Sequence, residues 1–418
     1  MNDIITPSGF DLTKNLHGHV RVETRSRWTG KVIDSQEKDN LVTNAIQKLV
    51  YATMWSANSA ANWFTPIYSK ALGSLVLFGD ALTESADNIF FPNKPPLAIA
   101  PYGANADADG GSLNTSESGF ISNGYTDVWD FTTSQANGTV AAIARSNYQL
   151  RSSGDFGAGL YYNTGLSAGY TTVTFLGYDE TNKYLYLVPT TSVTVNGTTF
   201  TTSSICKIKK DLEKIDLENC GIVPERIQLV KAVTSSDGTS TGYAWQYDRW
   251  KNEFIYITGS TLHHLAVDGT HTTDTLSGSG SGSNFAVTEN YYWRANGTTA
   301  YRISKTNLAD VTSYTLQNNS YCIFAVGNDL VAACDSSATN IRNYLYADGT
   351  IVRKTGLTNV SFDATPPKEI GMFYSGNRNS NNQLYPRLNY LGTIANLDSP
   401  VTKTSSQTMK ITYTLTEA

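Results

Sequence analysis

From residue 179 onward, seven carboxylates have the chemistry that glycoside hydrolysis needs: Asp179, Glu180, Asp248, Glu253, Glu289, Asp329 and Asp335. That reaction requires two carboxyl groups that face each other across a groove. Most of the seven lie in expected turns, such as Tyr178-Asp179-Glu180, where acidic side chains accept hydrogen bonds from the backbone. The sequence has no G-x-S-x-G elbow and no cysteine–histidine signature. We therefore predict that the chain is not an enzyme, and we keep glycoside hydrolysis as an alternative.

Aromatic side chains offer a second kind of chemistry, the stacking of sugar rings. The candidates for contact with a glycan are Tyr243, Trp245, Trp250, Tyr291 and Trp293. Tyrosine and tryptophan combine a flat apolar face with a polar tip that can bond to hydroxyl groups. We expect Tyr243, Trp245 and Tyr247 to alternate along one strand. The competing interpretation for each of them is core packing, because large aromatic side chains are mostly buried.

Metal-binding patterns are weak. The five histidines are His17, His19, His263, His264 and His271. His17 and His19 would share one face of a strand, but two ligands do not make a site. His263 and His264 would point to opposite faces of a strand. The stretch 105–114 resembles part of a calcium loop but lacks the glutamate spacing. We predict no metal and no cofactor.

The four cysteines are Cys206, Cys220, Cys322 and Cys334. None forms a C-x-x-C pair, which argues against a thiolate zinc site. Their apolar neighbours favour buried free thiols over disulfides.

Composition points to an all-β protein. Charged residues make up 16% of the 418 residues, while glycine and tyrosine number 33 and 25. Tyrosine, threonine, valine and isoleucine favour strands, and glycine, asparagine and aspartate favour tight turns. The net charge is −5 and no basic cluster occurs, so we expect no nucleic-acid partner. The first residues lack a secretion signal, and no apolar run is long enough to span a membrane.

The N-terminal part combines strands with one helix. Residues 18–34 alternate between apolar and polar side chains around a turn at Thr29-Gly30, which predicts two strands. Residues 41–57 carry an apolar stripe of helical period, with Asn40 or Thr43 as a cap. Asn137-Gly138 lies between two β-rich runs and predicts a hairpin. A glycine-rich stretch, 152–170, marks the domain boundary.

After this boundary a pattern of strands repeats. Each unit carries an apolar anchor, namely Ile208, Leu265, Ile303 and Leu345, and then a short strand that ends near Leu217, Leu276, Leu316 and Leu357. The spacing of roughly 40 to 60 residues is typical of propeller blades. Residues 369–394 supply a fifth unit. We predict a propeller of about five blades, with a stacked pair of sandwiches as the alternative.

Six Asn-Gly or Asp-Gly dipeptides, each followed by threonine, predict type I′ turns. They begin at Asn137, Asn196, Asp237, Asp268, Asn296 and Asp348.

The C-terminal strand belongs with the N-terminal part. Met409, Ile411, Tyr413 and Leu415 alternate with polar residues. The predicted fold is therefore mostly β: residues 1–165 form a sandwich base with one helix, 166–397 form the propeller-like insert, and 398–418 return to the base.

Three segments of the predicted base carry a resemblance to a family. They are WTGKVIDSQEKDNLVTNAIQKLVYA, GSLNTSESGFISNGYTDVWDFTTSQANGTVAAIAR and SPVTKTSSQTMKITYTLTE. Together they resemble the minor structural proteins, found in tails and baseplates, of phages of Gram-positive bacteria. The resemblance implies a place in the virion, in the tail, fibre, baseplate or neck appendage. It carries no catalytic motif.

The expected function is therefore anchoring to the phage particle together with recognition of the host surface, through a glycan. The expected partners are other virion proteins, host polysaccharide and further copies of the same chain, because weak contacts multiply with copy number. The protein would be made in the host cytoplasm. A purely structural neck or baseplate spacer and a tail-borne depolymerase are the alternatives.

Overall fold

The structure is a computed structural model. It describes residues 16–46, 72–101, 110–146, 173–189, 192–209, 227–276, 284–317, 319–325, 327–335, 341–355, 375–376, 383–384 and 390–417. These residues are almost entirely β-strands and turns, as predicted. No helix among them is long and apolar enough to cross a membrane.

The chain divides into two compact units. The first, here called the sandwich unit, comprises Met1–Ala158, Thr355–Asn359 and Asn389–Ala418. The second, the propeller-like unit, comprises Gly159–Lys354 and Val360–Leu388. The chain thus leaves the sandwich unit and returns to it. It belongs to the sandwich unit briefly at Thr355–Asn359 and again from Asn389, whereas the return was predicted at 398.

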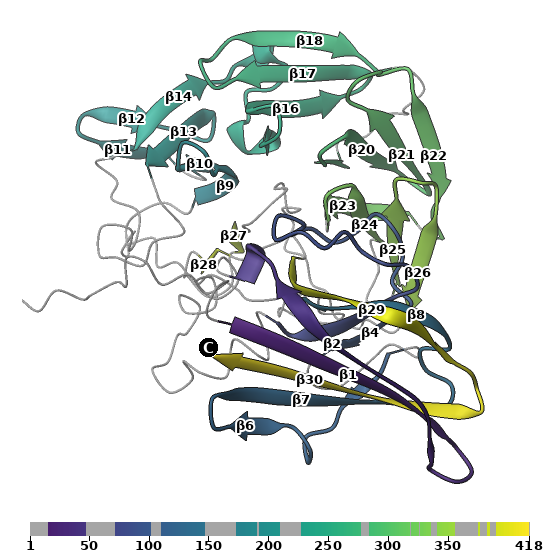
Figure 1. Cartoon of the computed structure of the whole chain (residues 1–418). Coiled ribbons are helices and arrows are strands. Elements are labelled where there is room, and N and C mark those ends of the chain that lie inside the picture. The colour runs from purple at the N-terminus through teal and green to yellow at the C-terminus, as the bar shows by residue number, and fades with distance from the viewer. Residues whose placement is uncertain are drawn as a thin grey trace, which may run out of the picture. The chain divides into compact units, whose positions relative to one another are not determined.

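The sandwich unit contains one ten-stranded sheet. Its strands are β1 (Leu16–Ser26), β2 (Val32–Val42), β3 (Ser74–Phe78), β4 (Ala98–Pro101), β5 (Ser112–Leu113), β6 (Gly119–Ile121), β7 (Gly124–Phe131), β8 (Gly138–Ser146), β29 (Leu391–Lys403) and β30 (Gln407–Glu417). They follow the order β4-β3-β8-β29-β2-β1-β30-β7-β5, and β6 pairs with β7 (Figure 1).

The two halves of this sheet face each other across one core. Arg145 of β8 is fully buried and forms an ion pair with Asp127 of β7. Its guanidinium lies 5.6 Å from the Trp129 ring and 5.2 Å from the Tyr413 ring. The Tyr413 hydroxyl in turn lies 2.5 Å from the Thr393 hydroxyl of β29. A buried charge is tolerated here because it is paired and surrounded by acceptors and ring faces.

The C-terminal strand completes the sandwich unit, as predicted. β30 lies between β1 and β7 and is antiparallel to both. Met409, Ile411, Tyr413 and Leu415 are all buried. Val20 and Val22 of β1 are buried on the same side, while His19 and Arg21 are exposed. The alternation of side chains across a strand accounts for this pattern.

The hairpin predicted around Asn137-Gly138 is wrong. β7 and β8 flank this turn, but β7 pairs with β30 and β8 pairs with β3 and β29. The dipeptide turns the chain from one half of the sheet to the other. A turn signal specifies a local reversal, whereas the partner of each strand depends on distant segments.

The predicted helix at 41–57 lies mostly outside the described residues. Leu41 and Val42 are the end of β2, and helical geometry begins at Ala45 and Ile46. The Thr43 hydroxyl accepts a hydrogen bond from the Ala45 amide at 3.3 Å, as expected of a residue that caps a helix.

The propeller-like unit contains four four-stranded sheets (Figure 1). The first has β9 (Val173–Asp179), β10 (Tyr184–Pro189), β13 (Ser204–Lys209) and β14 (Gln228–Ala232), with a small hairpin, β11 (Val193–Val195) and β12 (Thr198–Phe200), between β10 and β13. The second has β15 (Gln246–Asp248), β16 (Glu253–Thr258), β17 (Thr261–Ala266) and β18 (His271–Thr275). The third has β19 (Asn284–Val287), β20 (Tyr291–Asn296), β21 (Thr299–Ser304) and β22 (Val311–Thr315). The fourth has β23 (Ser320–Ala325), β24 (Leu330–Asp335), β25 (Ile341–Tyr346) and β26 (Ile351–Thr355).

The four sheets follow one another around an arc (Figure 1). The first strand of each sheet lies on the inner side of this arc, where it contacts the first strand of a neighbouring sheet. This is the arrangement of a propeller. The four predicted anchors, Ile208, Leu265, Ile303 and Leu345, are all buried and all lie in third strands. Each repeated unit of the sequence therefore corresponds to one blade.

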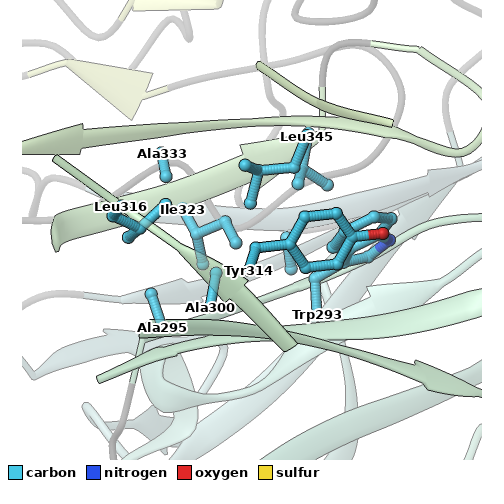
Figure 2. Packing of buried hydrophobic residues seen from close by; sticks show 10 residues of the cluster. Trp293, Ala295, Ala300, Tyr314, Leu316, Ile323, Ala333 and Leu345 are labelled. Carbon is cyan, nitrogen blue, oxygen red and sulfur yellow. The ribbon is translucent and has the colours of Figure 1, made fainter. Parts of the chain in front are cut away.

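Apolar cores fill the spaces between neighbouring sheets. Between the third and fourth sheets, Trp293 and Tyr314 pack beside Ile323 and Leu345 (Figure 2). Between the first and second sheets, Trp245, Tyr247 and others form a second core. Side chains of adjacent blades thus interdigitate as in any two packed sheets.

The described residues contain four blades, where about five were predicted. Of the fifth unit, 369–394, the structure describes a small pair, β27 (Ser375–Gly376) and β28 (Gln383–Leu384), and the start of β29, which belongs to the sandwich unit. The rest of that prediction lies outside the described residues.

Only one of the six predicted type I′ turns has positive φ at both central residues. Asn196 and Gly197 have φ of 48° and 78°. At the other five dipeptides only the glycine has positive φ. At Asp268 and Asp348 the carboxylate accepts a hydrogen bond from the amide of the threonine two residues later, at 2.8 and 2.9 Å. These are Asx turns, which use the aspartate side chain in place of a second positive φ.

Candidate recognition site on the turns of the blades

The turns between the first two strands of the four sheets form one connected group, here called the turn face. They comprise residues 180–183, 249–252, 288–290 and 327–329. Ion pairs and hydrogen bonds join each turn to the neighbouring sheet. Between the first and second sheets, Arg249 lies 3.0 Å from Glu180.

A buried ion pair joins the second sheet to the third. The Asp248 carboxylate contacts the Lys305 ammonium, and both side chains are almost fully covered. The other carboxylate oxygen accepts hydrogen bonds from the amides of Trp250 and Lys251, at 3.1 and 3.2 Å. Burial raises the pKa of Asp248 and lowers the pKa of Lys305, and the attraction between the two charges opposes both shifts.

Reciprocal hydrogen bonds join the third sheet to the fourth. Asn290 donates from its backbone and side-chain nitrogens to the two carboxylate oxygens of Asp329, at 2.9 and 2.6 Å. The Asn328 side chain donates to Glu289. Burial, with the nearby charge of Asp329, raises the pKa of Glu289.

The turn carboxylates thus have structural partners, which accounts for their positions. Asp179 accepts hydrogen bonds from the backbone and side chain of Asn182, both at 2.8 Å. Glu253 lies 3.0 Å from His264. The side chain of Asp335 lies outside the described residues.

Cations and aromatic rings alternate beside the buried ion pair. The Lys305 ammonium lies 5.1 Å from the centre of the Trp250 ring and 5.3 Å from that of Tyr292. Arg249 lies 5.6 Å from the Trp250 ring, and Lys251 donates to the Tyr292 hydroxyl at 3.1 Å. Trp250 is half-buried and lies among side chains that can donate hydrogen bonds. Such a combination suits a hydroxyl-rich or anionic ligand.

The five predicted aromatic residues do not form one site. Trp245 and Trp293 are fully buried, and the Trp293 indole donates to Thr288 at 2.9 Å. Both are core residues with no exposed ring face. The prediction that a sugar stacks on Trp245 and Trp293 is therefore wrong. Trp250 and Tyr291 lie on or beside the turn face. Tyr291 is half-buried, with Arg302 at 4.5 Å from its ring.

Tyr243 lies apart from Trp250. It is 38% exposed and belongs to a short 3-10 helix, Gly242–Ala244, that precedes β15. The predicted strand through Tyr243, Trp245 and Tyr247 is therefore wrong in its first part. Gly242 and the turn-forming residues before it favour this tight turn. The sequence did not indicate Lys305 as a site residue. Its partner lies in another blade, so no pattern among the neighbouring residues predicts the pair.

The three histidines of the second sheet occupy two separate environments, as the alternation of His263 and His264 on β17 predicted. His263 and His271 have nearly parallel rings, with two ring nitrogens 3.1 Å apart. His264 faces Glu253 and Asp274 instead. Among the described residues, no three histidine, cysteine, aspartate or glutamate side chains are placed to hold a metal ion.

Cys206 is a buried free thiol. Burial raises its pKa to about 12. Cys220 and the side chains of Cys322 and Cys334 lie outside the described residues, as does the first half, 105–109, of the stretch 105–114.

Comparison with known proteins identifies no family. No family model and no curated protein matches the chain. Among solved structures, it is similar to the Neurospora crassa Pan2 WD40 domain, with 10% identity, a TM-score of 0.26 and coverage of 45% of this chain and 57% of that domain. It is also similar to the virginiamycin B lyase from Staphylococcus aureus, with 10% identity, a TM-score of 0.27 and coverage of 58% and 94%. A chain of a nidogen/laminin complex matches with 7% identity and a TM-score of 0.31 over 90% and 99%.

Proposed function

We propose that this chain is a structural and host-recognition protein of a bacteriophage tail or tail appendage. In this role the sandwich unit attaches to the particle and the propeller-like unit contacts a polysaccharide of the host surface. The observation that carries the proposal is the insertion of one unit into the other. The chain leaves the sandwich unit after β8 and re-enters it at β29, so the propeller-like unit is held at both of its ends.

An inserted module of this kind suits display. The sandwich unit has its own core, and β30 completes its sheet by pairing with β1 and β7. The propeller-like unit has its own cores between blades. Each unit can therefore be stable while performing a separate task.

The turn face is the proposed contact with the host glycan. Trp250 is half-buried, and Arg249 and Lys251 lie on the same turn. Weak contacts of this kind become effective when several copies act together.

Two measurements test the proposal. Antibodies against the purified protein should label tails of phage particles that contain it, and the protein displayed on beads should bind host cells and compete with phage adsorption. Labelling without binding or competition would leave the structural spacer as the function. Release of reducing ends from host wall polysaccharide would instead establish the depolymerase. Absence of the protein from purified particles would refute the proposal.

A further inference from the structure

The turn between β1 and β2, residues 27–33, is here called the basic tip. It combines exposed apolar side chains with two basic side chains. Trp28, Val32 and Ile33 are 78%, 46% and 56% exposed. The tip is held in one conformation by Ser26, whose carbonyl accepts from the Gly30 amide at 2.9 Å and whose hydroxyl accepts from the Trp28 amide at 3.3 Å. An ordered tryptophan in solvent is a frequent anchor of protein interfaces.

The basic tip carries two uncompensated positive charges. The Arg27 guanidinium lies 4.3 Å from the Trp28 ring. Neither Arg27 nor Lys31 has a carboxylate within ion-pair distance in the described part of the chain. The surface that covers the tip should therefore be acidic.

The opposite end of β2 has the complementary charge, and it is here called the acidic end. Asp39, Glu84 and Asp398 surround a single lysine, Lys38, whose ammonium lies 2.6 Å from Asp398. The side chains of Asp39 and Asp398 are 92% and 73% exposed. Three carboxylates against one ammonium leave two negative charges, equal and opposite to those of the basic tip. His19, 2.9 Å from Asp39, reduces this charge only when it is protonated.

The two surfaces cannot meet within one molecule. Val32 begins β2 and Lys38 is its seventh residue, so at about 3.3 Å per residue they lie about 20 Å apart on a rigid strand. Leu82 is half-buried and belongs to the acidic end, because its amide donates to the Asn396 side chain and the Asn396 amide donates to Glu84. The occupant that satisfies both surfaces is another copy of the same chain.

We infer that copies of this protein associate head to tail, with the basic tip of one sandwich unit docked on the acidic end of the next. A head-to-tail contact of this kind is heterologous, so its repetition leads to a ring or an open filament. The inference holds whether or not the protein belongs to a phage.

The test uses two variants of the full chain that damage different halves of the contact. Trp28→Ser removes the anchor of the basic tip, and the double variant D39N/D398N neutralises the acidic end. Sedimentation velocity should show oligomers of the wild-type protein that dissociate in high salt, and each variant should weaken association by about tenfold or more. Circular dichroism should show that both variants keep the strand content of the wild type.

Mixing the variants gives the decisive result. Trp28→Ser retains an intact acidic end and D39N/D398N retains an intact basic tip, so an equimolar mixture should form one-to-one dimers and nothing larger. A mixture that stays monomeric, or a wild-type protein that is monomeric at high concentration, would overturn the inference. Binding of monomeric wild type to vesicles of phosphatidylglycerol, lost in Trp28→Ser, would also overturn it and identify the tip as a membrane contact.

Discussion

The Asp248 carboxylate and the Lys305 ammonium, from neighbouring blades, form an ion pair from which solvent is almost completely excluded. Replacing Asp248 with asparagine should destabilise the propeller-like unit by about 3–5 kcal/mol, because Lys305 would remain buried without a counter-charge. Urea denaturation followed by tryptophan fluorescence measures this change.

The matched control for this pair is Asp80→Asn. Asp80 pairs with Lys94 at 3.4 Å, and both side chains are well exposed. This change should cost less than about 1 kcal/mol. Equal effects of the two substitutions would contradict the burial of the Asp248–Lys305 pair.

Two tryptophans of the propeller-like unit should behave oppositely when replaced by alanine. Trp250→Ala should leave the melting temperature nearly unchanged and reduce binding to host cells, since the half-buried ring is proposed to contact the glycan. Trp293→Ala should cost about 3–5 kcal/mol, because its fully buried ring fills the core between two blades (Figure 2). Undiminished binding by Trp250→Ala would remove the turn face from the proposed function.

The pair His263–His271 should make the propeller-like unit sensitive to acid. Burial, with the neighbouring rings of His271 and His264, lowers the pKa of His263, while Asp237 opposes the shift. The folded state therefore binds fewer protons than the unfolded state. Stability is complete above the unfolded pKa of about 6.5 and is lost as the pH falls through the folded pKa of His263.

Thermal unfolding between neutral and mildly acidic pH checks this prediction. Asp237, with Lys231 at 2.8 Å, and His264 are the other charged groups around the pair. The variant His263→Asn should flatten the pH dependence below neutrality. A variant whose melting temperature falls with pH as steeply as that of the wild type would show that the acid sensitivity arises elsewhere.

Two glycines of the sandwich unit provide a test of strand packing. A Cβ atom added at Gly124 would lie 2.0 Å from the Leu415 carbonyl oxygen of β30, whereas one added at Gly119 would meet nothing within 4 Å. Gly124→Ala should destabilise the sandwich unit by about 1–3 kcal/mol, because backbone cannot yield easily. Gly119→Ala should change stability by less than about 0.5 kcal/mol. Guanidinium denaturation of both variants measures the difference.

Local patterns in the sequence predicted much of the fold. The alternation in 409–415 identified β30, and the anchors Ile208, Leu265, Ile303 and Leu345 identified the third strand of every blade. Periodicity succeeds there because each strand has one face in a core. It failed at Asn137-Gly138, where the turn was recognised but the strands on either side pair with segments far along the chain.

The candidate site was less predictable. Asp179 lies at a turn, as predicted, and accepts hydrogen bonds from Asn182, because Asx geometry is local. Trp245 and Trp250 are five residues apart and look alike in sequence, yet one is core and the other is partly exposed. Which face of a blade meets its neighbour depends on packing between distant segments, and no nearby residue encodes it.

The position of β30 in the middle of its sheet determines when the sandwich unit can form during synthesis. The Thr416 hydroxyl contacts the His17 carbonyl although 399 residues separate them in sequence. A ribosome must therefore synthesise β30 before β1 gains this neighbour, while the blades can assemble earlier from contiguous segments. Chains that end before β30 would have an incomplete sheet. In that sheet, the edges of β1 and β7 that normally pair with β30 would be unpaired. Such chains should consequently have folded blades but no complete sandwich unit.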